Sequence, residues 1–466
     1  MRDLVRSAGA PPVRLVHLGL GNFFRAHQAW YTGNAADAPE WGIAAFTGRS
    51  SERSRARVAA LRSQDGLYTV ITRAADGDRF EVVASLAQIH LADEHAAWLG
   101  YLADPQVQVI TSTVTEAGYV RGPLGGVDVD RPEVKADLTA LRADLTAPVS
   151  TAPARLVAGF AARRLAAGLA APGHLAAAPL TVVPCDNLPG NGTAVAAVVS
   201  DLATLVDPEL ARWITGNVSY ATTMVDRITP EPTPEDVAGA QAATGIPDRA
   251  AIVTEPFSEW VISGDFAAGR PQWEDAGATF TSDVAPFEDR KLWLLNGAHS
   301  MLAYAGSIRG HVTVADAMRD QTCRGWLDQW WDASSRHLSL PAADNAAYRA
   351  ALIERFANPR LAHRLDQIAW DGSQKLPIRV LPTIRLERAA GRLPVGVIRP
   401  VAAWICHLRG TGAKVTDARA DELVPLANGP LTEAVRRVLK ALDPELAADE
   451  AVVAAVLAQA IELGQP

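Results

Sequence analysis

Apolar and polar positions alternate over about the first 280 residues in a way that is typical of strands and crossover helices. Several short apolar runs, bounded by Gly, Pro or Asp, are apolar on both faces, as strands of a helix-covered parallel sheet are. The strands predicted in this way are VRLVHLGL (13–20), WGIAAFT (41–47), VQVITSTVT (107–115), LTVVPCD (180–186) and NVSYATTMVD (217–226). The stretches LYTVITR and FEVVASL, on either side of AADGD, predict an inserted antiparallel hairpin.

From about Asp289 the pattern changes to long helical periodicities with Pro and Gly between them, as in KLWLLNGAHSMLAYAGSI and PLTEAVRRVLKAL. A chain of 466 residues also exceeds what one hydrophobic core usually fills. We therefore expect an α/β protein of two domains. Residues 1–285 should form a doubly wound sheet, and residues 286–466 a mostly α-helical domain.

Composition and charge exclude several classes of protein. The formal net charge is −8 and the acidic excess is spread along the chain, whereas nucleic-acid binders gather Lys and Arg on one face. Cys185, Cys323 and Cys406 lie far apart, which indicates neither a disulfide framework nor a thiolate zinc site. No apolar run is long enough to cross a bilayer, and the start of the chain does not read as a secretion signal. We expect a cytoplasmic protein, with monomer as the default oligomeric state.

A glycine turn follows the first predicted strand and opens a helix. Gly19 and Gly21 permit positive backbone torsions and the close approach of a pyrophosphate, whose charge the helix N-terminus would meet. The third glycine of the dinucleotide fingerprint is missing, because Phe24 stands there, so a plain strand-to-helix turn is an alternative. The position after the first strand favours a Rossmann-like nucleotide site.

The end of the second predicted strand bears on the choice of cofactor. An acidic residue there would bind the ribose hydroxyls of NAD, but Arg49 and Ser50 stand at that place and Glu52 comes slightly later. The sequence therefore leaves the preference open, and we expect NAD with NADP as a possible alternative.

Asn296 and His299 interrupt the apolar helical stretch LWLLNGAHSMLAYAG, and Lys291 directly precedes it. At about 100° per residue an α-helix places Asn296 and His299 one turn apart on the same face, with Lys291 about 140° round from Asn296. Burying such groups costs free energy unless they are bonded or used. Alternatively, Lys291 extends to solvent, Asn296 closes a helix–helix hydrogen bond and His299 is a core histidine. We favour function for the three together.

These residue types suit hydride removal from a secondary alcohol. The reaction needs a base for the hydroxyl proton, and a lysine serves if burial and nearby positive charge lower its pKa. It also needs donors aimed at the oxygen that becomes a carbonyl, which asparagine amides supply.

Seven motifs together resemble the polyol-specific long-chain dehydrogenases and reductases, the family of mannitol 2-dehydrogenase, arabinitol dehydrogenase and the fructuronate and tagaturonate reductases. The resemblance covers nearly the whole chain. The motifs are LGLGNFFRAHQAWYT near the start, TSTVTEAGY (111–119), PCDNLPGNG (184–192), MVDRITP (224–230), TEPFSEWVI (254–262), KLWLLNGAH (291–299) and DGSQKLP (371–377).

The resemblance implies a role for each matched residue. Lys291 would be the general acid/base, Asn187 and Asn296 would polarise the substrate oxygen, His299 would orient the substrate and Glu288 would pass protons to bulk water. The implied cofactor-binding residues are Gly19, Gly21, Asn22, Phe23, Arg25 and Asp226, to which the position at the end of the second strand adds Arg49. The remaining implied substrate-binding residues are Arg227, Lys375 and Gln367.

Some implied roles have structural alternatives. Asn187 could cap the following helix, Asp226 and Arg227 could form only an ion pair, Glu288 could be a first-turn acid, and Lys375 could be a solvated loop residue. Gln367 stands where the mannitol enzymes are expected to have a substrate-contacting arginine. Arg364, Lys375 and Arg379 could instead supply positive charge for a carboxylate, so a neutral polyol and a sugar acid both remain open.

The leading hypothesis is a zinc-independent NAD(P) oxidoreductase acting on the C2-type hydroxyl of an acyclic polyol, of the mannitol/fructose or arabinitol/xylulose type. A fructuronate reductase (D-mannonate oxidoreductase) acting on a sugar acid is the alternative within the family. A metal-assisted alcohol dehydrogenase lacks an evident ligand set among the scattered Cys and His residues. A catalytically silent NAD(H)-binding sensor is the alternative from another class.

Overall fold

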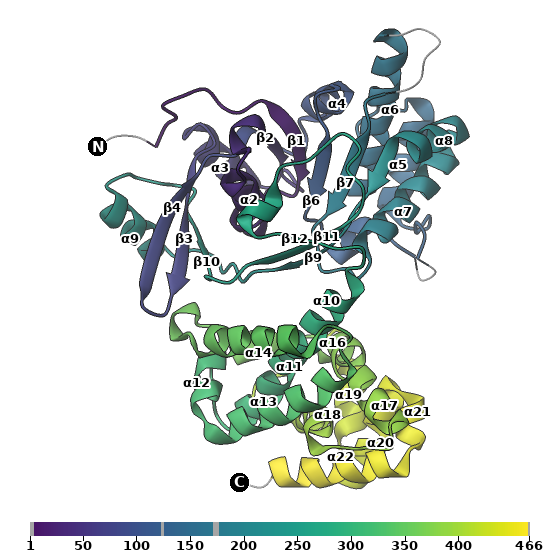
Figure 1. Cartoon of the computed structure of the whole chain (residues 1–466). Helices are drawn as coiled ribbons and strands as arrows, with labels where there is room; N and C mark the ends of the chain where they lie inside the picture. Colours follow the sequence, from purple (N-terminus) through teal and green to yellow (C-terminus); the bar gives the residue numbers. More distant parts are fainter. Residues whose placement is uncertain (1–3, 123–124, 171–176, 465–466) are drawn as a thin grey trace. The chain divides into compact units, whose positions relative to one another are not determined.

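The computed structural model describes residues 4–122, 125–170 and 177–464, which divide into two compact units. Unit 1 spans Met1–Ala285 and unit 2 spans Pro286–Pro466. Unit 1 holds every strand of the described chain, whereas unit 2 is helical (Figure 1). This confirms the predicted α/β class, with a doubly wound sheet first and helices after it.

The main sheet of unit 1 has six parallel strands in the order β5-β2-β1-β6-β7-β8. Its strands are β1 (Val13–Leu18), β2 (Gly42–Phe46), β5 (Leu86–His90), β6 (Val109–Ser112), β7 (Leu180–Pro184) and β8 (Val218–Tyr220). Alternate side chains of one strand enter different cores: Val16 and Leu18 pack in one hydrophobic cluster and Leu15 in the other. The sheet is therefore buried on both faces, which is why its strands read as continuous apolar runs.

Helices cover this sheet, as in other doubly wound folds. The α-helices of unit 1 are α1 (Asn22–Ala26), α2 (Gln28–Asn34), α3 (Glu52–Arg62), α4 (His95–Ala103), α5 (Pro132–Ala143), α6 (Ala152–Ala170), α7 (Asn191–Val206), α8 (Pro208–Asn217) and α9 (Pro234–Thr244). One core cluster joins the sheet to α4–α8, and the other joins it to α1–α3 together with Trp260 and Trp273.

Two small sheets complete unit 1. The predicted hairpin forms as β3 (Tyr68–Ala74) and β4 (Gly77–Val83), which pair antiparallel, and β10 (Ile252–Thr254) joins β3. The second small sheet contains β9 (Thr222–Asp226), β11 (Glu259–Ser263) and β12 (Thr279–Phe280). The prediction of one strand over residues 217–226 was wrong, because the chain leaves the main sheet at Ala221. A Cβ on Gly264 would lie 2.8 Å from the Cα of Ala221, so a tight crossing fixes this change of sheet.

Unit 2 is built around a buried helix, α18 (Val395–Leu408), in which every residue from Gly396 to Leu408 is buried. Helices α13 (Gln321–Ser334) and α22 (Glu450–Leu463) pack against it. The remaining α-helices are α10 (Ala285–Arg290), α11 (Ala298–Met301), α12 (Val314–Arg319), α14 (Ala342–Ala357), α15 (Leu365–Ile368), α16 (Gly372–Arg379), α17 (Leu381–Ala389), α19 (Ala420–Ala427), α20 (Leu431–Leu442) and α21 (Pro444–Ala448).

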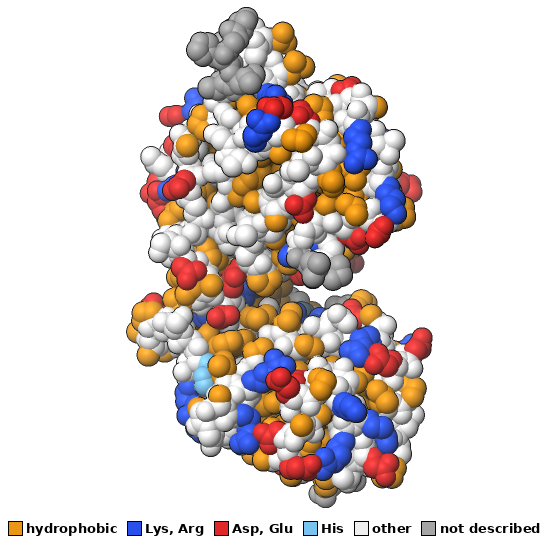
Figure 2. All heavy atoms as spheres, turned by 90° about the vertical axis from the view of Figure 1, so that its right-hand side faces the viewer, with side chains coloured by type: hydrophobic (Ala, Val, Ile, Leu, Met, Phe, Trp, Pro, Cys, Tyr) orange, Lys and Arg blue, Asp and Glu red, His pale blue; other side chains and the backbone are white. Residues whose placement is uncertain are grey.

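The surface agrees with the charge pattern of the sequence. On the face shown in Figure 2, basic and acidic side chains are interspersed over both units instead of being gathered by sign. None of the helices in the described ranges has the length and apolarity that a membrane span requires.

Candidate functional site

The glycine turn lies where three parallel strands end side by side. The N–H groups of Gly19 and Leu20 donate to the Phe46 carbonyl at the end of β2, over 2.8 and 2.9 Å. On the other side, the Thr113 hydroxyl after β6 donates to the Gly19 carbonyl over 2.8 Å. Gly19 has φ +118°, and a Cβ there would lie 2.6 Å from the Thr113 hydroxyl oxygen. Only glycine fits this position.

Gly21 and the helix after it differ from the expectation. Gly21 has φ −120°, so only one of the two glycines takes the positive torsion that the sequence suggested. Helix α1 has five residues and ends at Ala26, and the non-helical His27 separates it from α2, which begins at Gln28. Phe24, in place of the third glycine, is fully buried and stacks on His17 of β1 with ring centroids 3.4 Å apart. A large ring therefore fills the helix–strand contact that a third glycine would keep narrow.

Arg25 supports the turn from inside the protein. It is 3% exposed, donates to the carbonyls of Gly21 and Ala250, and reaches the Asn22 side chain over 2.8 Å. Burial lowers its pKa to about 10. Asn22 is half-buried and also donates to Glu231 over 2.9 Å. These bonds hold the backbone of the turn in place.

A cavity of about 630 Å³ opens beside the turn, and Gly19, Gly48, Arg49, Thr113 and Arg155 are among its lining residues. It lies at the carboxyl ends of β1, β2 and β6, where the strand order reverses, which is where doubly wound sheets bind nucleotides. Its volume is within the usual range of cofactor pockets. The glycine turn and this cavity together fit a dinucleotide, and Arg49 is exposed at the ribose end of β2.

Asn187 is exposed on the loop after β7, at the same edge of the sheet. The next helix begins at Asn191 with Gly190 as its N-cap, so Asn187 does not serve as the cap that was the structural alternative. The residue before it, Asp186, accepts hydrogen bonds from the Tyr119 hydroxyl and from the Leu188 N–H, the latter over 3.0 Å. Burial raises the pKa of Asp186 to about 6.

Three polar residues within the motifs TSTVTEAGY and PCDNLPGNG were given no role from the sequence: Tyr119, Asp186 and Asn191. Asn191 is fully buried and exchanges hydrogen bonds of 3.0 Å with both backbone groups of Thr223. Tyr119 and Asp186 join the loop after β6 to the loop after β7. The sequence carried no clear signal for these roles, because the burial of Asn191 and the pairing of Asp186 with Tyr119 depend on the fold.

Asp226 and Arg227 both lie inside unit 1, at the end of β9. They are 4% and 7% exposed. Arg227 donates to the carbonyl of Ala26 at the end of α1, and its guanidinium lies 4.7 Å from the ring centroid of Trp30. Arg227 thus connects β9 with the helix that follows the glycine turn.

In unit 2, Lys291–Gly297 (η4) forms a π-helix, followed by α11 and a second π-helical segment, Leu302–Gly306 (η5). The expectation of an α-helix was wrong for this segment. In a π-helix the hydrogen bonds join residue i to residue i+5, so residues five apart lie almost above one another. Lys291 and Asn296 are five apart and both half-buried, so they share one face instead of diverging by about 140°.

His299 lies on α11 with its ring stacked on Phe356 of α14, at a centroid distance of 4.7 Å, and edge-on to His363 at 4.9 Å. It is 7% exposed, and its Nε2 has no hydrogen-bond partner among the described residues. Burial, and then electrostatic interactions with His363, Arg355, Arg379 and Lys375, hold its pKa well below the usual value. A neutral imidazole with one nitrogen lacking a partner fits a residue that binds a substrate hydroxyl better than it fits a core histidine, whose nitrogens would both be hydrogen-bonded.

The candidate carboxylate ligands differ in their burial and in their hydrogen-bond partners. Lys375, on α16, is half-buried and donates to the Ile368 carbonyl over 3.1 Å. Burial and the positive charge of Arg379 lower its pKa. Arg364 is exposed and bound twice by Asp366, over 3.0 and 2.7 Å, which neutralises it. Gln367 is exposed on α15.

Arg355 was missed by the sequence reasoning. It is 6% exposed and acts on His299 from the same helix that carries Phe356. Nothing in the local pattern of α14 distinguishes it from a surface arginine. Glu288, by contrast, lies where expected, half-buried on α10 three residues before Lys291.

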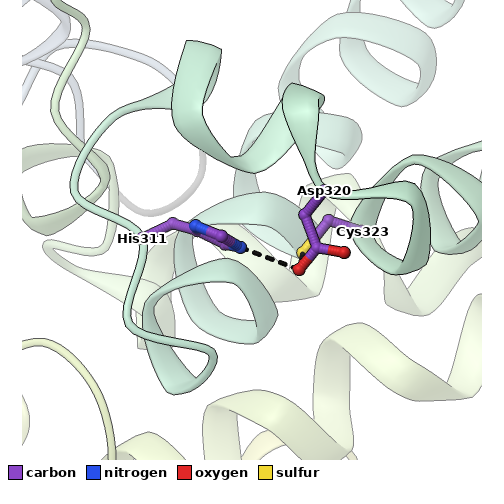
Figure 3. Close-up of side chains that lie close together, drawn as sticks. All are labelled: His311, Asp320 and Cys323. Carbon is purple, nitrogen blue, oxygen red and sulfur yellow. Dashed lines mark hydrogen bonds and ion pairs between the residues drawn. The ribbon is translucent and has the colours of Figure 1, made fainter.

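A cluster of metal-ligand type also forms in the described part of unit 2, from His311, Asp320 and Cys323 (Figure 3). Its donor atoms lie within 4.8 Å of one another. Asp320 already accepts from His311 over 2.8 Å and from the Arg309 guanidinium over 2.6 Å, and it caps α13 through Thr322. Burial raises the pKa of the Cys323 thiol to about 12. The cluster is therefore an ion-pair network at a helix start.

Comparisons with known proteins agree over most of the chain. The family model for the mannitol dehydrogenase Rossmann domain matches residues 13–275, and that for the mannitol dehydrogenase C-terminal domain matches residues 283–463. D-mannonate oxidoreductase of Escherichia coli (strain K12) is 39% identical over 404 residues, which is 85% of this chain and 80% of that protein.

Two solved structures are similar over both units. A D-sorbitol dehydrogenase in substrate-free form is 30% identical with a TM-score of 0.86, covering 98% of this chain and 96% of that one. Mannitol 2-dehydrogenase of Pseudomonas fluorescens, in a ternary complex with NAD and D-mannitol, is 30% identical with a TM-score of 0.79, covering 97% and 92%.

Proposed function

The chain belongs to the mannitol dehydrogenase family, and from this premise we propose that it transfers a hydride between NAD(P) and a secondary hydroxyl of an acyclic polyol or sugar acid without a catalytic metal ion. The observation that supports the proposal is the π-helix Lys291–Gly297, in which the half-buried Lys291 and Asn296 are separated by the five residues of one hydrogen-bonded π-turn. The glycine turn and its cavity supply the place for the dinucleotide.

In the oxidation direction, the Nζ of Lys291 takes the hydroxyl proton while the hydride leaves the same carbon. The glycine turn of Gly19 would hold a bound NAD(P), whose nicotinamide would supply the hydride acceptor. Asn296 donates a hydrogen bond to the substrate oxygen as it becomes a carbonyl, and such a fixed donor stabilises developing charge. The same role is proposed for Asn187 of unit 1 on the family resemblance alone. Glu288, on the preceding turn, passes the proton from Lys291 to solvent.

His299 binds a substrate hydroxyl through its Nε2, because that buried atom otherwise lacks a partner among the described residues. A neutral ring can serve as donor or acceptor, according to its tautomer.

A specific observation favours a sugar acid as the second candidate substrate class. Positive charge from Arg355, Arg379 and Lys375 acts on His299, and Arg and Lys side chains are the usual ligands of a carboxylate. A neutral polyol needs no such charge. The E. coli relative named as a D-mannonate oxidoreductase is consistent with this class.

The direct test of the mechanism is Lys291→Ala. We expect kcat to fall by roughly 10² to 10⁴, as is typical for a lost general base, while NADH binds as in the wild type. Lys414→Ala is the matched control, because Lys414 is an exposed lysine of the same unit. Full activity of the Lys291 variant would refute the assignment.

The substrate class is tested with mannitol, arabinitol and mannonate, each with NAD and NADP, by following the absorbance of the reduced cofactor. A higher kcat/KM for mannonate favours the sugar acid, and a higher value for either polyol favours the neutral substrate. Activity that survives EDTA supports the metal-free mechanism. Silence with every pair, combined with tight NADH binding, would favour a sensor.

A further inference from the structure

The π-helix η4 packs against α13 through two adjacent tryptophans. Trp330 and Trp331 are both fully buried. The indole N–H of Trp330 donates to the Trp293 carbonyl over 2.9 Å, and that of Trp331 donates to the Leu294 carbonyl over 2.8 Å. Both acceptors are backbone atoms in the middle of η4, so α13 bonds to the helix backbone itself.

Such bonds matter for a π-helix more than for an α-helix. The wider turn is rarely stable by itself and usually occurs as a short insertion in an α-helix. A carbonyl oxygen can accept two hydrogen bonds, so a side-chain donor adds to whatever the helix supplies. Two indole donors on successive carbonyls therefore stabilise the backbone of η4 at its centre.

Gly297, at the end of η4, shows how close this approach is. A Cβ there would overlap the ring of Trp330, with only 2.9 Å to its Cε2. The ring of Trp331 stacks on that of Phe356 at a centroid distance of 6.3 Å, and Phe356 in turn stacks on His299. The tryptophan pair thus contacts both the π-helix and the ring that supports His299.

We propose that Trp330 and Trp331 are positioning residues that hold Lys291–Gly297 in its π-helical form and so keep Lys291 and Asn296 on one face. The inference rests on the proposed function for the roles of those two side chains. If the segment relaxed to an α-helix, Asn296 would stand about 140° round the helix axis from Lys291. The acid/base group and the oxygen ligand would then no longer face the same atom.

The experiment uses Trp330→Phe, Trp331→Phe and the double variant, which keep a buried aromatic ring and remove the N–H donors. We expect kcat to fall about fivefold for each single variant and on the order of 20-fold for the double variant, as for lost hydrogen bonds of ordinary strength. KM and NADH binding should change less than kcat. The pH profile of kcat should shift, because the surroundings of the acid/base group change.

Trp326→Phe is the control on the same helix, since its ring lies against Arg309 and Arg399 and not on η4. Hydrogen exchange over residues 292–298, measured by mass spectrometry, reports the helix without reference to activity. Faster exchange together with a lower kcat in the two N–H deletions, and neither in the control, supports the proposal.

Unchanged kcat, pH profile and exchange in the double variant, or equal losses in Trp326→Phe, would overturn it. Gly297→Ala gives a second route if the double variant does not fold, because its methyl group pushes Trp330 away from η4. A wild-type phenotype for Gly297→Ala would also overturn it. Activity retained by Lys291→Ala would instead refute the proposed function, while the exchange result would still test the positioning role.

Discussion

Asp186 provides a prediction that can be worked through from its surroundings. The carboxyl group precedes Asn187 on the loop after β7 and accepts from the Tyr119 hydroxyl and the Leu188 N–H. Burial nevertheless raises its pKa from 3.8 to about 6. A rise of that size corresponds to at most about 3 kcal/mol of free energy between the two protonation states.

Proton linkage determines the direction in which stability changes with pH. Because the folded pKa is above the unfolded value, the folded state binds the proton more tightly, and the stability that this adds is present below pH 4. It is lost as the pH rises from about 4 to about 6 and stays lost above that. Asp186→Asn mimics the protonated form at every pH, so the variant should gain stability relative to the wild type over this window, by up to about 3 kcal/mol.

The assay is hydrogen exchange of peptides from β7 and α7, because exchange reports the opening free energy of this part of unit 1. Wild type and Asp186→Asn are compared at several pH values between 4 and 7.5, so that all other titrating groups cancel. A difference that does not change with pH would refute the reasoning. A wild type that becomes relatively more stable above pH 6 would show that the carboxylate, and not the acid, is favoured by the fold.

Two further predictions concern positions that the fold constrains. Gly19→Ala should destabilise unit 1 by roughly 2–4 kcal/mol and weaken NADH binding at least about tenfold, because φ is +118° and the methyl group meets Thr113. Gly48→Ala is the control, because Gly48 lines the same cavity at an open position. Equal NADH affinities of the two variants would contradict the argument. Glu387→Gln should lower the free energy of unfolding by roughly 3 kcal/mol at neutral pH, since this buried carboxylate binds Arg336 over 2.9 Å and Arg392 over 2.8 Å. The deficit should shrink as the pH falls below about 4, because the folded state holds the pKa of Glu387 below its usual value. Thermal melts at pH 4 and 7 measure the deficit, and a deficit that does not change with pH would count against the prediction.

Several features of the fold were determined by local sequence alone. The four strands β1, β2, β6 and β7 and the hairpin were predicted because period and apolar content are local properties, and a buried parallel strand needs both faces apolar. The glycine turn was predicted because Gly19 stands directly after the first strand. The helical character of unit 2 followed from its long periodicities.

Other features depend on contacts between distant residues. The change of sheet at Ala221 is set by a crossing with Gly264, and the positive surroundings of His299 come from α14 and α16, neither of which marks the residues concerned in its own pattern. The helical form of Lys291–Gly297 is the clearest case. The stretch has a helical period, but a helical segment of seven residues is compatible with either winding. Bonds from α13, more than 30 residues away in sequence, accompany the π form, and a helix chooses between windings that differ little in energy by what packs against it.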